Sequence, residues 1–140
     1  MLTAKGLGNG LPIGVCMARG EAAQLLGPGD HGSTYGGNTL CCAAAIAVLT
    51  TLRDDTVMQR ARSVREVLLT ALHGAITDSD LIAEVRGRGL MIGIQPRVAT
   101  KEIVQRGLES GLLINVAGGD TIRVLPPLVM NDEQAGALGA

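Results

Sequence analysis

Apolar residues recur at intervals of three and four along residues 57–72, and this period constrains the fold more than any other feature of the sequence. The set is Val57, Ala61, Val64, Leu68 and Leu72. Because an α-helix has about 3.6 residues per turn, the spacing places the set on one face and predicts an amphipathic helix that ends near Gly74. A hydrophobic content of 46% and a net charge of -1 agree with a folded chain, since disordered chains combine low hydrophobicity with high net charge.

Short apolar segments separated by turn-forming residues predict the other elements. We expect strands at residues 11–18, 81–85, 90–94, 112–116 and 121–125. We expect helices at residues 19–24, 40–52 and 100–110 and a last helix after residue 131. We expect Asn38 or Thr39 to cap the helix at residues 40–52 and Thr100 to cap the helix at residues 100–110. Asn131 and Gln134 have the spacing of a capping box at the start of the last helix.

Both ends of the sequence suggest that it is cut. The last predicted helix has barely two turns before Ala140, and a helix that short is marginal without packing. A glycine-rich segment at residues 4–14 begins with almost nothing before it. Residues 40–52 are apolar nearly all round, which is typical of a helix buried among other elements, and we expect more protein around it than 140 residues supply.

The composition excludes several classes of function. A net charge of -1 without a lysine or arginine cluster gives no basis for binding nucleic acid or a membrane surface. No apolar run reaches the roughly 18 residues of a spanning helix, so we expect a soluble, cytoplasmic protein. Cys16, Cys41 and Cys42 form a poor disulfide framework and lack the spacing with histidine that zinc requires, so we expect reduced and buried thiols and no metal.

Lys5, which precedes a glycine-rich turn in apolar surroundings, is the first candidate for chemistry. Desolvation lowers the pKa of a lysine and frees its amine as the nucleophile that a Schiff base needs. The alternative is an ordinary surface lysine. A nucleotide-binding P-loop is excluded, because there the lysine follows the glycines, and Gly8, Gly10 and Gly14 are one residue too widely spaced for a dinucleotide fingerprint.

Two further segments are candidate anion sites. Residues 31–38 offer the hydroxyls of Ser33 and Thr34 and flexible glycines before a helix, which suits a phosphate, although an ordinary capping loop has the same composition. Arg123 lies in an apolar strand and can grip a carboxylate or form a structural salt bridge. Arg86 and Arg88 carry the same ambiguity. His31 and His73 have no nucleophile nearby in sequence, and we interpret them as structural.

Four motifs, in this order and spacing, resemble the class III aminotransferases that depend on pyridoxal 5'-phosphate (PLP), and within that class the acetylornithine aminotransferases. They are AKGLGNGLPIG at residues 4–14, HGSTYGGN at 31–38, VRGRGLMIGI at 85–94 and IRVLPPLV at 122–129. The resemblance implies an α/β chain of the PLP-dependent transferase fold type I. Residues 1–54 would end the large PLP-binding domain, and residues 55–140 would form the small C-terminal α/β domain, truncated at its last helix.

The resemblance also implies a role for each matching residue. Lys5 would be the catalytic lysine that bonds to PLP and moves the proton on the substrate. Thr34 would bind the cofactor phosphate from the neighbouring subunit of a homodimer. Ser33 would lie close to bound acetylornithine, and Arg123 would grip the α-carboxylate of 2-oxoglutarate or glutamate, which favours the carboxylate role over the salt bridge.

The implied reaction is amino transfer from N2-acetylornithine to 2-oxoglutarate, a step of arginine biosynthesis. The alternatives are another omega-aminotransferase, acting on ornithine, succinylornithine or 4-aminobutyrate, and a truncated product without catalysis. The family's phosphate loop, ring-stacking aromatic and pyridinium-binding aspartate lie upstream of its lysine and have no counterpart in this sequence. We therefore expect the 140 residues to be inactive as a transaminase on their own.

Overall fold

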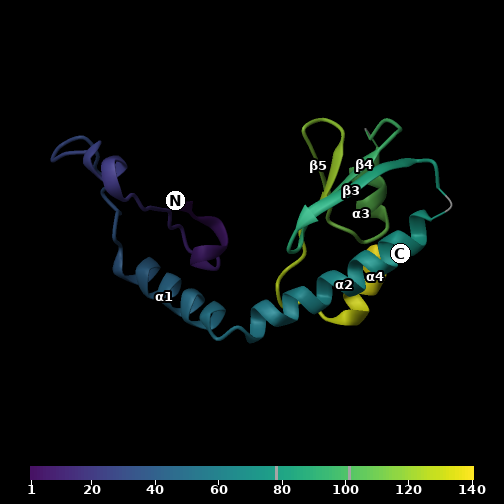
Figure 1. Cartoon of the computed structure of the whole chain (residues 1–140), viewed down its shortest axis with the longest axis horizontal. Helices are drawn as coiled ribbons and strands as arrows, with labels where there is room; N and C mark the ends of the chain where they lie inside the picture. The colour runs from purple at the N-terminus through teal and green to yellow at the C-terminus, as the bar shows by residue number, and fades with distance from the viewer. Residues whose placement is uncertain (78, 101) are drawn as a thin grey trace. The chain divides into compact units, whose positions relative to one another are not determined.

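A computed structural model describes residues 1–77, 79–100 and 102–140 (Figure 1). Its contacts divide the chain into an N-terminal unit, Met1–Asp55, and a C-terminal unit, Thr56–Ala140. Lys101, which falls in the helix predicted at residues 100–110, lies outside the described residues. The assignment of the two units to a large and a small domain stays a prediction.

In chain order, the N-terminal unit contains β1 (Leu2–Thr3), η1 (Lys5–Gly8), β2 (Val15–Cys16), η2 (Gly20–Gln24) and α1 (Thr39–Arg53). β1 and β2 pair in antiparallel fashion, with Leu2 opposite Cys16 and Thr3 opposite Val15. The strand predicted at residues 11–18 is therefore much shorter than expected, because β1 offers two residues for it to pair with. The short helix predicted at residues 19–24 is present as the 3-10 helix η2.

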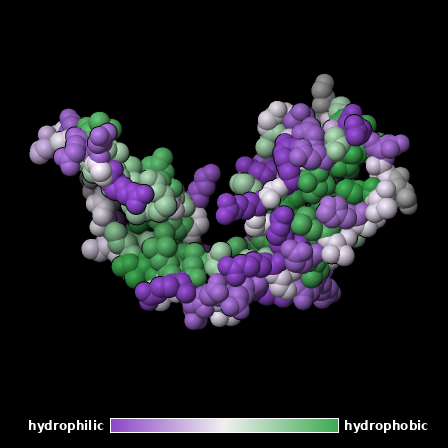
Figure 2. All heavy atoms as spheres, viewed as in Figure 1, coloured by the Kyte–Doolittle hydropathy of each residue, from purple (hydrophilic) through white to green (hydrophobic). Residues whose placement is uncertain are grey.

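The cap of α1 is confirmed, and several of its large apolar side chains are exposed within these 140 residues. The Oδ1 atom of Asn38 accepts a hydrogen bond from the backbone N–H of Cys41 at 3.2 Å. Ala45 is the buried residue of α1. The large apolar side chains that stay more than half exposed are Leu40, Ile46 and Leu49. They contribute to the green, apolar surface that covers α1 in Figure 2. Within this unit α1 packs against η1, a single turn that covers one side of the helix.

The cysteines are free, but the prediction that they are buried is wrong. Cys16 is exposed on β2, and Cys41 and Cys42 are partly buried in α1. The physical reason is the thinness of the N-terminal unit. A sheet of two short strands leaves Cys16 uncovered, and α1 has packing on one side.

The C-terminal unit is an antiparallel sheet covered by two helices. Its elements are α2 (Thr56–Ile76), β3 (Ile82–Arg88), β4 (Met91–Pro96), α3 (Ile103–Glu109), β5 (Asn115–Ala117), β6 (Thr121–Val124) and α4 (Asp132–Gly139). The strands pair in the order β3-β4-β6-β5, with every pair antiparallel. The predicted amphipathic helix at residues 57–74 is confirmed as α2, and the strands predicted at residues 112–116 and 121–125 are present, with shifted bounds, as β5 and β6.

The core of this unit lies between the sheet and the helices α2 and α4. Its buried residues are Ala61, Val64 and Leu68 from α2, Leu90, Ile92, Ile94 and Val124 from β4, β6 and the turn before β4, and Ala135 from α4. Val64 and Ala135 are fully buried. The face of the sheet that carries Ile92 and Val124 is thus packed, and the opposite face is free to carry polar side chains.

A side-chain cap fixes the start of α4, whereas α3 begins without one. The capping box at α4 is confirmed, because Gln134 N donates to Asn131 Oδ1 at 2.8 Å and Asn131 N donates to Gln134 Oε1 at 3.1 Å. The predicted cap by Thr100 is wrong. Glu102 precedes α3 without a side-chain cap, and the Thr100 hydroxyl instead donates to the Gly119 carbonyl at 3.4 Å.

The strand predicted at residues 81–85 continues further than the sequence indicated. β3 runs through Gly87, which has a φ of 151°, to Arg88, and pairs with β4 along that length. The Nη1 atom of Arg65 on α2 donates to the Gly89 carbonyl at 2.7 Å and holds the turn that joins the two strands. Of the helices in the described ranges, none is long and apolar enough to span a membrane.

Candidate functional site

Lys5 opens η1 in a strained backbone conformation. Its φ is 55°, in the left-handed region, while Ala4 before it is extended. That region costs an L-residue about 1–2 kcal/mol, and such strain is often retained where a side chain must be presented in one direction. The turn is held closed by the bond from Asn9 N to the Gly6 carbonyl at 3.1 Å. A Cβ atom on Gly8 would lie 2.9 Å from Ile13 Cγ2, so a larger residue there would force the Ile13 side chain to shift.

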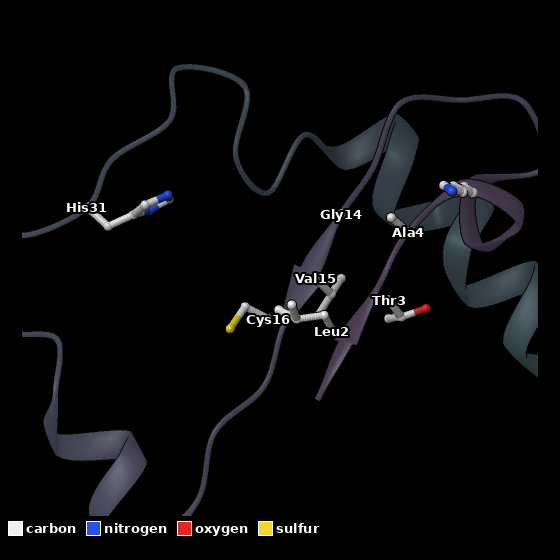
Figure 3. A pocket seen from close by; sticks show the side chains of 8 residues that line it. Leu2, Thr3, Ala4, Gly14, Val15, Cys16 and His31 are labelled. Atoms are coloured by element: carbon white, nitrogen blue, oxygen red, sulfur yellow. The ribbon is translucent and has the colours of Figure 1, made fainter. Parts of the chain in front are cut away.

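Beside this turn lies an open pocket with a volume of about 520 Å³. Lys5 lines it together with residues of β1 and β2 and with His31, whose imidazole is directed toward the pocket from the loop before α1 (Figure 3). This volume is within the range of about 300–1,000 Å³ that is common for small-molecule sites. His31, which we interpreted as structural, therefore faces the pocket. The sequence could not indicate this, because His31 lies 26 residues from Lys5 and only the fold brings both residues to the same pocket.

The burial of Lys5 differs from the expectation. We predicted a desolvated lysine, but Lys5 is exposed, because the glycines that follow it place little side-chain volume around it. The residues of the pocket wall fit the aldehyde end of PLP, where a lysine amine is required. The polar side chains of the wall are Thr3, Lys5, Cys16 and His31, and the wall does not include the predicted phosphate-binding residue Thr34.

Ser33 and Thr34 lie in the same unit as Lys5 but are not part of the pocket wall. They occupy a turn in which Gly36 N donates to the Ser33 carbonyl at 3.1 Å, just before the Asn38 cap of α1. Both side chains are exposed, and within residues 1–77, 79–100 and 102–140 neither hydroxyl has a recorded hydrogen bond. Both hydroxyls are therefore available to a ligand or to another protein surface.

Arg123 lies on β6, on the face of the sheet opposite the core. Its Nε atom donates to Asn115 Oδ1 on β5 at 3.1 Å, and among the described residues it has no acidic partner. Arg86, in contrast, forms an ion pair with Glu84 at 2.9 Å. Arg86, Arg88 and Arg123 line an open pocket of about 290 Å³. Of the two alternatives, Arg86 forms the structural salt bridge, while the positive charge of Arg123 remains available to bind an anion.

A family model for class III aminotransferases matches residues 1–138 of the chain. The chain is 42% identical over 135 residues to an acetylornithine aminotransferase of Bordetella pertussis, in an alignment that covers 96% of this chain and 34% of that protein. It is 48% identical over 136 residues to the acetylornithine aminotransferase of Mycobacterium tuberculosis, in an alignment that covers 94% of this chain and 32% of that protein. The chain spans about a third of the length of these relatives.

Solved structures of similar proteins have the same arrangement of elements. The ornithine δ-aminotransferase of Plasmodium falciparum superposes with a TM-score of 0.87 at 32% identity, covering 99% of this chain and 36% of that one. An ornithine aminotransferase of Toxoplasma gondii, with PLP at partial occupancy in its active site, superposes with a TM-score of 0.86 at 34% identity. The superposition covers 99% of this chain and 34% of that one. The acetylornithine aminotransferase of Elizabethkingia anophelis superposes with a TM-score of 0.82 at 32% identity, covering 99% of this chain and 36% of that one. The predicted α/β fold of the PLP-dependent transferases is confirmed.

Proposed function

Because the chain belongs to the class III aminotransferases, which depend on PLP, we propose that it supplies the reactive lysine and the carboxylate-binding arginine of a transaminase. The observation that carries this proposal is the position of Lys5. It stands in a left-handed conformation at the start of a glycine turn and lines a pocket of ligand size. When bound, PLP supplies an electron sink for the charge that develops on the substrate carbon.

Each candidate residue then has a distinct role. The Nζ atom of Lys5 would hold the aldehyde end of PLP and, when released as a free amine, would move a proton at the substrate carbon. The Thr34 hydroxyl binds the phosphate of PLP from the neighbouring subunit of a homodimer. Ser33 lies beside the amino donor, and Arg123 binds the α-carboxylate of 2-oxoglutarate. The exposure of Ser33 and Thr34 supports this assignment, because their hydroxyls have no partner recorded in the described part of the chain.

The substrate that we propose is N2-acetylornithine, with 2-oxoglutarate as the acceptor, in arginine biosynthesis in the cytoplasm. The names of the curated relatives, which are acetylornithine aminotransferases, support this amino donor. Ornithine is the second candidate donor, and the similarity to solved ornithine aminotransferases supports that alternative.

We also propose that these 140 residues have no transaminase activity by themselves. Lys5 is exposed and the pocket wall does not include Thr34, so the proposed phosphate ligand is not beside the lysine in this chain. The direct assay follows glutamate formation from 2-oxoglutarate and each donor, with added PLP. Turnover above that of free PLP, abolished by Lys5→Ala, would contradict the inactivity while supporting the role of the lysine.

A chimera tests the proposed function itself. Residues 1–138 replace the matching third of the Mycobacterium tuberculosis acetylornithine aminotransferase, and transamination is measured. We expect an active chimera whose turnover Lys5→Ala abolishes, and a Ser33→Ala variant with a raised KM for N2-acetylornithine. A folded, PLP-containing chimera that keeps its turnover after Lys5→Ala would refute the proposal.

A further inference from the structure

Arg123 is held by a neutral partner on one edge of its guanidinium. Asn115 and Arg123 are direct partners in the register of β5 and β6, and the Nε–H of Arg123 donates to Asn115 Oδ1 at 3.1 Å. An arginine can bind a carboxylate with the edge formed by Nε and one Nη, or with the edge formed by its two Nη atoms. Because Asn115 occupies Nε, the edge that remains is the pair Nη1 and Nη2. For that pair no hydrogen bond is recorded in the part of the chain that the structure describes.

The neighbouring arginine shows why the identity of the partner matters. The guanidinium of Arg86 binds the Glu84 carboxylate at 2.9 Å and the Thr121 hydroxyl at 3.3 Å, so its charge is compensated and both of its Nη atoms have partners. The side chain of Asn115 carries no charge. Arg123 is therefore oriented by a hydrogen bond without losing the net positive charge that attracts an anion.

The backbone beside Arg123 leaves room for such an anion. Gly93 is opposite Arg123 on β4 and separates it from Arg86 on β3. A Cβ atom on Gly93 would lie 3.2 Å from Thr121 Cγ2 and 3.8 Å from Arg86 Cγ, so the glycine keeps the space between the two arginines free of a side chain. The pocket of about 290 Å³ includes this position and Arg123.

We propose that Asn115 is a positioning residue for Arg123, which fixes the guanidinium through Nε so that Nη1 and Nη2 together bind the carboxylate of the keto acid. The inference rests on the proposed function, in which Arg123 binds that carboxylate. An unfixed arginine loses rotamer freedom when it binds, and pre-orienting it removes part of that cost. The N–H groups of the two Nη atoms donate to the two oxygens of a planar carboxylate, which gives one binding geometry.

The test uses nitrogen-15 NMR of the arginine side chains in the full 140-residue chain, with 2-oxoglutarate as the probe. The Nε–H signal of Arg123 is assigned with Arg123→Lys. Asn115→Ala removes the acceptor, and we expect the exchange of this proton with water to speed up and the Kd for 2-oxoglutarate to rise about tenfold. Gln95→Ala is the matched control, since Gln95 contacts Arg86 and Thr121 on the same face and should leave both values unchanged.

Asn115→Asp separates positioning from a general structural role. It keeps the acceptor, so exchange should stay slow, but its carboxylate competes for the guanidinium, so 2-oxoglutarate should bind more weakly than in Asn115→Ala. Unchanged exchange and unchanged Kd in Asn115→Ala, with binding lost in Arg123→Lys, would overturn the positioning role and leave the proposed function intact. If 2-oxoglutarate fails to shift the Arg123 signal in the unsubstituted chain, Arg123 does not bind the carboxylate in this chain, and the proposed positioning role of Asn115 in that binding is refuted.

Discussion

Gly87 lies between Arg86 and Arg88, and we expect an added methyl group there to lower the free energy of unfolding of the C-terminal unit more than at its other glycines. It has a φ of 151° within β3, opposite Ile92 in the register with β4. A Cβ atom on Gly87 would overlap the carbonyl oxygen of Met91 and would lie 2.9 Å from Ile92 Cα. Both atoms are backbone, so the contact cannot be relieved by rotating a side chain, and β3 would have to move away from β4.

The size of the effect follows from these two causes. A residue with a side chain in this φ region costs about 1–3 kcal/mol. Overpacking against atoms that cannot move adds about 1–3 kcal/mol. Gly89→Ala is the matched control, because Gly89 also has a positive φ, 56°, but a Cβ atom there would have nothing within 4 Å. Its expected cost is the left-handed strain alone, about 1–2 kcal/mol.

Urea unfolding followed by far-UV circular dichroism is the appropriate assay, because the chain has no tryptophan and its one tyrosine, Tyr35, lies in the N-terminal unit. The free energy of unfolding should fall at least twice as far in Gly87→Ala as in Gly89→Ala, with the m-value unchanged. Equal losses in the two variants would refute the reasoning, since they would show that the overlap with Met91 has no energetic consequence.

Three other substitutions test the packing of the same unit, each read out as a change in the free energy of unfolding. Asn131→Ala should cost about 0.5–2 kcal/mol by removing the capping box of α4, and a loss below that range would mean that water replaces the cap. Leu68→Ala should cost about 2–5 kcal/mol, because Leu68 is 2% exposed in the core, and a neutral result would contradict the described packing. Gly139→Ala should loosen α4 from α2, because its Cβ atom would lie 2.7 Å from Ala71 Cβ and 2.8 Å from the Leu68 carbonyl oxygen, and an unchanged stability would argue against this contact.

Elements whose pattern is local could be predicted from the sequence. The apolar period of α2, the Asn38 cap and the capping box at Asn131 each depend on residues a few positions apart, and each is present. Thr100 failed as a cap because its hydroxyl bonds to the Gly119 carbonyl, which is distant in sequence. The strand at residues 11–18 was overestimated because its length depends on the two residues of β1 that pair with it.

The candidate site could be predicted in part for the same reason. The motif around Lys5 indicated a functional lysine, and the structure places that residue at a strained turn beside a pocket. The sequence could not indicate that His31 lines the pocket, or that Asn115 bonds to Arg123, because both relations arise from folding. The expected burial of Lys5 failed because apolar neighbours in sequence do not cover a side chain unless the fold brings them over it.

The most direct test of the central claim is to map where PLP becomes attached. The chain has two lysines, Lys5 and Lys101, so Lys101 and the N-terminal amine are internal references for nonspecific reaction. The full chain is incubated with PLP, reduced with borohydride and digested, and the labelled peptides are quantified by mass spectrometry. We expect labelling of Lys5 to exceed that of Lys101 at low PLP concentration and to be unaffected by Lys101→Arg. Equal labelling of the two lysines and the N-terminal amine would contradict the claim that this chain forms a PLP-binding site at Lys5.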